Sequence, residues 1–116
     1  MKNIVISFLL LIIASSCTND SESDLTVPAP IVVKYSTDVK PIIQANCIEC
    51  HTNPPQNGAP MPLLTYENVR DAIIARGLIN RISSTDPNFS MPFGRDRLPQ
   101  SKIDLIIAWK NSNYPQ

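Results

Sequence analysis

The chain has 116 residues, of which 43% are hydrophobic, and ten Lys and Arg residues are balanced by ten Asp and Glu residues. This length allows one folded domain. The near-neutral charge and the lack of a basic stripe argue against nucleic acid as a partner, and they predict little long-range steering from net charge.

Residues 1–16 are predicted to be an export signal. Lys2 precedes an apolar run from Ile4 to Ala14 that is too short to remain as a membrane-spanning helix. Small residues then lead directly to Cys17, a pattern that resembles a bacterial lipoprotein signal with Ala14 in place of the usual Leu. We therefore expect cleavage before Cys17 and acylation of its sulfur and its new amino group. The alternative is an ordinary secretory signal that leaves Cys17 as a free thiol.

Residues 17–34 are predicted to be a lipidated flexible tether. Residues 18–24 are polar and acidic, and Pro28 and Pro30 stiffen the segment that follows. The acidic run also resembles the surface-export signals of lipoproteins in the Bacteroidota. Residues 31–33 are interpreted either as a short extended strand or as the point where order begins. We expect an exported, membrane-anchored lipoprotein on the periplasmic side or on the outer-membrane surface.

The folded domain is predicted to cover residues 35–116 and to begin with a helix from about Val39 to Cys50. Residues 36–38 are all competent N-caps, and Pro41 is tolerable only in the first turn. This helix would direct Ile42, Ile43 and Cys47 toward the core.

The end of this helix carries the pentapeptide Cys47-Ile48-Glu49-Cys50-His51, a CxxCH motif typical of c-type haem attachment. On a helix, Cys47 and Cys50 share a face, so both sulfurs can form thioethers with one porphyrin. His51 follows at once and can act as the proximal iron ligand. It is the only histidine in the chain.

The motif has three other interpretations. A thioredoxin-like CxxC pair expects a βαβ context, which the chain does not show. A zinc site usually needs four ligands, and the motif supplies only three. A structural disulfide between Cys47 and Cys50 would leave His51 without a role.

Two further helices are predicted after the motif. Thr65 caps one that extends to about Arg76, where Gly77 is a natural stop. The last runs over residues 100–111, with Ile and Trp side chains at helical spacing. Residues 78–82 are compatible with a helical turn or an extended segment.

Two irregular loops separate these elements. Residues 52–62 contain four prolines and Gly58, which exclude regular structure. Residues 83–98 form the second loop and contain Met91-Pro92-Phe93-Gly94. Because Pro92 restricts the backbone of Met91 to extended geometry, this step can hold a thioether in place.

Residues 35–113 resemble a small class I type monohaem cytochrome c domain. More narrowly, they are similar to bacterial domains that begin with a V-x-P-I helix and continue through a Leu-Thr-Tyr-Glu helix start and a Met-Pro loop. Those domains close with an I-x-x-I-x-x-W helix, which is approximated here by Ile103, Ile106 and Trp109. The resemblance implies a mainly α fold of three to four helices and irregular loops around one covalent haem c, with the first and last helices crossing near Trp109.

The resemblance also implies roles for single residues. Met91 would be the sixth iron ligand, and Met61, which also precedes a proline, is the alternative. The carbonyl of Pro62 would accept the second ring N–H of His51 and so orient the ring. A packing or loop-shaping role is the other interpretation of Met61 and Pro62. Three arginines are candidates to pair with haem propionates: Arg81, Arg95 and Arg97.

The function expected from these features is one-electron transfer through a single His51/Met91-ligated haem, by a carrier that is not an enzyme. Its partners would be a redox protein, through a small and transient contact, and a membrane, through the lipid on Cys17. The first alternative is a five-coordinate haem peroxidase or small-ligand sensor. The second is a haem-bearing accessory lipoprotein of a membrane complex.

Overall fold

Helices make up all the regular secondary structure of residues 31–116, the part of the chain that the computed structural model describes. A five-residue π-helical segment, η2 (Tyr35–Val39), continues into α2 (Lys40–Asn46), and three α-helices follow: α3 (Tyr66–Ala75), α4 (Leu78–Ser83) and α5 (Gln100–Asn111). The predicted mainly α fold is confirmed. The predicted signal peptide, Cys17 and the tether up to residue 30 lie outside the described residues.

The first helical segment starts and ends earlier than the sequence suggested. Its first residue is Tyr35 rather than Val39, because the carboxylate of Asp38 accepts the backbone N–H of Lys34 at 2.8 Å and satisfies a donor at the helix start. This bond and one from the Thr37 hydroxyl lower the pKa of Asp38. Regular helix ends at Asn46, whose side-chain amide donates to the Ile42 carbonyl at 2.7 Å and competes with the backbone.

The prediction for α3 is confirmed. Thr65 and Asn68 form a reciprocal capping box at its start, and Gly77 adopts φ +68° just after its end. Residues 78–82, for which the sequence left two possibilities, are helical and belong to α4. The predicted bounds of the last helix match α5.

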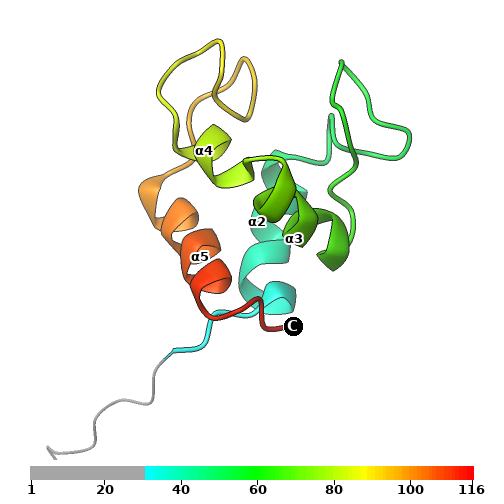
Figure 1. Ribbon diagram of the computed structural model, residues 1–116. Helices are drawn as coiled ribbons and strands as arrows, with labels where there is room; N and C mark the ends of the chain where they lie inside the picture. The colour runs from blue at the N-terminus through cyan, green and yellow to red at the C-terminus, as the bar shows by residue number, and fades with distance from the viewer. Residues whose placement is uncertain (1–30) are drawn as a thin grey trace, which may run out of the picture.

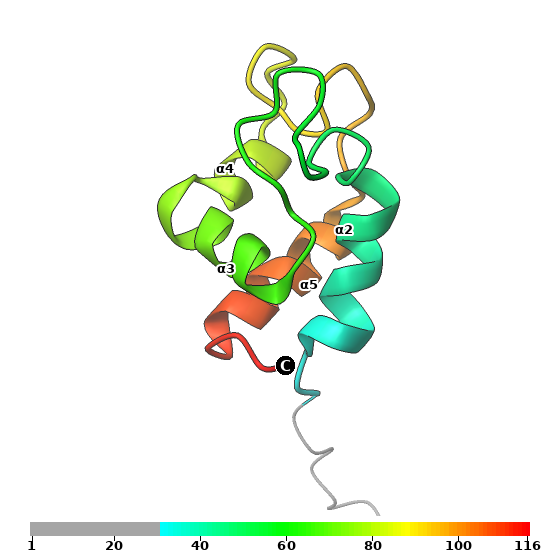
Figure 2. The same ribbon diagram turned by 90° about the vertical axis from the view of Figure 1, so that its right-hand side faces the viewer.

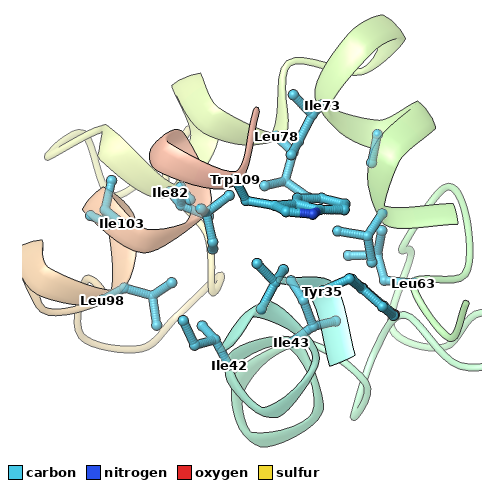
Figure 3. Packing of buried hydrophobic residues seen from close by; sticks show 14 of the residues in the cluster. Tyr35, Ile42, Ile43, Leu63, Ile73, Leu78, Ile82, Leu98, Ile103 and Trp109 are labelled. Carbon is cyan, nitrogen blue, oxygen red and sulfur yellow. The ribbon is translucent and has the colours of Figure 1, made fainter. Parts of the chain in front are cut away.

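Trp109 of α5 is fully buried near the centre of the hydrophobic cluster (Figure 3). Its ring lies 5.5 Å from that of Tyr35 in η2 and 5.6 Å from that of Tyr66 in α3, measured between centroids. Ile103 and Ile106 of α5 are also fully buried. The first and last helical segments therefore meet at Trp109, the arrangement that the resemblance implied.

The C-terminal tail folds back on this aromatic cluster. The Pro115 carbonyl accepts the indole N–H of Trp109 at 2.7 Å and the backbone N–H of Tyr35 at 2.9 Å. The Tyr114 ring packs edge-on against Trp109 at 5.0 Å, and its carbonyl accepts the hydroxyl of Tyr66 at 2.8 Å. Both ends of the folded domain are thus bonded to each other.

The two long loops, residues 52–65 and 84–99, lie at the opposite end of the domain. Figures 1 and 2 show both loops at the top, with the C-terminus and the start of η2 at the bottom. The aromatic cluster therefore closes one end of the domain, and the two long loops form the other end.

Deleting residues 114–116 should lower the free energy of unfolding by roughly 2–4 kcal/mol, because it removes four hydrogen bonds and an aromatic contact and leaves the buried indole N–H without its acceptor. Urea denaturation of the purified protein measures this change. Tyr66→Phe, which removes one of these bonds, is the graded control and should cost about 1 kcal/mol. A truncated protein as stable as the full chain would contradict the role given to the tail.

Candidate functional site

Cys47, Cys50 and His51 lie in the turn that follows α2. Regular helix has ended, yet the bonds keep its spacing: the N–H of Cys47 donates to the Ile43 carbonyl at 2.8 Å, and the N–H of His51 donates to the Cys47 carbonyl at 3.0 Å. The turn is therefore a direct extension of α2, and it places the three residues together at the end of this helix.

All three residues line a cavity of about 910 Å³. Met61, Met91 and Pro92 from the two long loops also line it. Buried apolar side chains contribute to its wall from the rest of the domain: Ile43, Leu63, Leu78, Ile82, Leu98 and Ile106. The structure thus brings the motif and both candidate methionines to one largely apolar cavity.

The ring of His51 is buried and held on one side by the first long loop, residues 52–65. Its Nδ1 lies 2.8 Å from the Met61 carbonyl, and its own backbone carbonyl accepts the N–H of Leu63 at 2.8 Å. A carbonyl can only accept, so Nδ1 carries a proton, and Nε2 is the ring nitrogen whose lone pair a metal could use. No hydrogen bond to Nε2 is made by residues 31–116, and the ring lines the cavity.

The acceptor differs from the one expected. We predicted the carbonyl of Pro62, but the bond goes to Met61, one residue earlier. The physical reason is the second bond of the pair, because Leu63 N–H reaches the His51 carbonyl and sets the register of residues 61–63 against the ring.

Met61 and Met91 are both half-buried against the hydrophobic core, but they reach the cavity by different routes. Met61 lies in the first long loop, and its own backbone carbonyl is bonded to Nδ1, on the side of the ring away from Nε2. Met91 belongs to the loop between α4 and α5, where its N–H donates to the Arg81 carbonyl at 3.0 Å.

The two cysteines are free thiols with different surroundings. Burial raises the pKa of the Cys47 thiol to about 11, so it is protonated at neutral pH. The sulfur of Cys50 accepts a weak hydrogen bond from the side-chain amide of Asn57 at 3.5 Å. Asn57 has φ +51°, a conformation that Asn tolerates well. Sequence reasoning missed this residue because no motif connects it to the cysteines.

The arginines proposed to meet propionates are partly committed elsewhere. Arg95 forms an ion pair with Glu49, inside the CxxCH motif. Arg97 donates to the Ser83 carbonyl at 3.1 Å and does not line the cavity. Arg76, which the sequence did not single out, does line it, together with Arg81 and Arg95.

Within residues 31–116, no three His, Cys, Asp or Glu side chains are grouped so that they could hold a metal ion by themselves. The same residues contain no helix with the length and hydrophobicity needed to cross a membrane.

Comparison with known proteins gives one distant similarity. The chain is 26% identical over 99 residues to the hydrazine synthase subunit alpha of Kuenenia stuttgartiensis. The aligned residues cover 83% of this chain but only 12% of that protein. No family model matches the sequence. No solved structure matches it either.

Proposed function

We propose that the protein transfers single electrons through one c-type haem bound in the cavity at the loop end. The observation that carries the proposal is that Cys47, Cys50, His51 and Met91 line one cavity, with the Nε2 of His51 left free. Thioether sulfurs and an imidazole at this spacing are the residues that hold such a group.

The cavity suits an apolar macrocycle. Its volume of about 910 Å³ lies in the upper part of the range for small-molecule sites, and buried aliphatic side chains form much of its wall. Arg95, one of the arginines predicted to meet propionates, lines the cavity and supplies positive charge for carboxylate groups. A bound haem would supply reversible one-electron chemistry at its iron.

The protein's own contribution is to orient and tune the ligands. The hydrogen bond from Nδ1 to the Met61 carbonyl fixes the tautomer of His51, directs Nε2 as the ligand atom and raises its basicity. Met91 would complete the iron site, since its loop is separate from the one that holds Nδ1. Methionine ligation raises the reduction potential. A closed site of this kind leaves no substrate position, so we propose a carrier rather than an enzyme.

We further propose that residues 1–16 export the chain, that Cys17 carries the lipid and that residues 17–34 tether the domain to a membrane. The domain would then work on the periplasmic side or on the outer-membrane surface, with a redox protein as its partner. Haem c is attached outside the cytoplasm, so the export signal and the CxxCH motif require the same compartment.

A second candidate function is that of a haem-bearing accessory module of a larger assembly. It is favoured by the similarity to a segment that makes up only 12% of a much longer subunit. Tight co-purification with a membrane complex would support this candidate, and a freely exchanging monomer would support the carrier. A five-coordinate peroxidase or sensor requires that neither Met91 nor Met61 binds iron.

The protein matured in a bacterial periplasm should give a pyridine haemochrome spectrum typical of two thioethers and a weak ferric sulfur-to-iron absorption band. Met91→Ala should abolish this band and lower the reduction potential, because the thioether is lost. Met61→Ala is the matched control and should keep the band, since Met61 holds His51 through its backbone carbonyl. A band lost in Met61→Ala but kept in Met91→Ala would refute the ligand choice, and a spectrum without haem would refute the proposed function.

The double variant with Cys47→Ser and Cys50→Ser should be poorly folded, because a small domain with a cavity of this size lacks part of its core without the macrocycle. We expect loss of near-UV circular dichroism with much of the far-UV signal retained. Cys17→Ser, a cysteine outside the domain, is the control and should keep both signals. A double variant with native thermal stability and no haem would show that the fold does not need the group.

A further inference from the structure

Arg81 of α4 contacts the segment that contains Met91 in three ways. Its backbone carbonyl accepts the N–H of Met91 at 3.0 Å. Its guanidinium Nη1 donates to the Phe89 carbonyl at 3.2 Å, and its Cζ lies 4.1 Å from the centroid of the Phe89 ring. One residue thus binds both Met91 and the residue two positions before it.

The helix that carries Arg81 is itself well fixed. Leu78 and Ile82 on either side of it are buried in the core, and the N–H of Arg81 donates to the Gly77 carbonyl at 3.1 Å. The loop, in contrast, exposes 41% of Phe89 and 68% of Phe93. Met91 itself is half-buried against the core, but the phenylalanines on either side of it are exposed, so polar contacts to α4 help to restrict the position of the segment.

The loop that contains Met91 is also connected to the CxxCH motif, by a weaker contact. Arg95 pairs with Glu49, but the two side chains are 52% and 65% exposed. Exposed ion pairs contribute little, because water and salt screen them. The guanidinium of Arg81, in contrast, both donates to the Phe89 carbonyl and covers the Phe89 ring. Both interactions depend on its planar fork.

We infer that Arg81 is a positioning residue that holds Met91 over the iron site and keeps external ligands out. The inference rests on the proposed function, and it gives Arg81 a different role from that of a propionate partner. When the guanidinium is removed, the backbone bond remains, but the segment from Phe89 to Met91 loses its two side-chain contacts. Met91 should then leave the iron more often, and a competing ligand should bind more tightly.

The test is a titration of the ferric holoprotein with imidazole. Binding is measured as the loss of the sulfur-to-iron absorption band. Arg81→Met should raise the affinity for imidazole about tenfold, as expected from a charge-assisted hydrogen bond and a cation–π contact together. Arg81→Lys should raise it nearly as much, because an ammonium group keeps the charge but lacks the fork. Phe89→Leu, at an exposed position where folding is not at risk, should raise it about threefold.

Arg76→Met is the matched control. It removes the same charge from the same cavity, and no hydrogen bond from the Arg76 side chain to the Met91 loop is seen in the described residues. We expect imidazole affinity within about twofold of the unmodified protein, since exposed charges act weakly at a distance.

Two results would overturn the inference. One is equal imidazole affinity in Arg81→Met and Arg76→Met. The other is full restoration by Arg81→Lys with no effect of Phe89→Leu, which would mean that only the charge of Arg81 matters. Failure of the proposed function is separately visible, because the unmodified protein would then lack haem or the sulfur-to-iron band before any variant is compared.

Discussion

The hydrogen bond between Nδ1 of His51 and the Met61 carbonyl determines the orientation of the whole site. It joins the turn after α2 to a loop segment ten residues later, and the bond from Leu63 N–H to the His51 carbonyl keeps the two in register. Since Nδ1 is used, Nε2 is the nitrogen left for a ligand role. The proposed use of Nε2 as the iron ligand follows from this direction of the ring.

The two ends of the domain use their side chains in different ways. At one end, Trp109 and three tyrosines pack closely, and the Pro115 carbonyl bonds to both Trp109 and Tyr35. At the other, two loops leave a cavity of about 910 Å³. In a domain this small, the tight aromatic end supplies only part of the core, and the proposed haem would supply the part that is missing at the loop end.

Most of the helices could be predicted from the sequence because their signals are local. Thr65 with Asn68 and the glycine at position 77 mark the ends of α3, and apolar spacing marks α5. The first helical segment was misplaced by four residues at each end. Its limits depend on the Asp38 and Asn46 side chains, which bond to the backbone in a way that several neighbouring residues could equally have done.

The sequence by itself determined the CxxCH motif on which the proposed haem site rests, because Cys47, Cys50 and His51 are close in the chain and any helical turn brings them together. It also limited the candidate sixth ligands to Met61 and Met91. Only the tertiary structure decided which carbonyl holds His51, that Asn57 meets Cys50, and that Arg81 contacts Phe89 rather than facing solvent. These contacts join loop residues whose conformations no local pattern specifies, so they exist only once the helices have packed around Trp109 and brought the loops to one end.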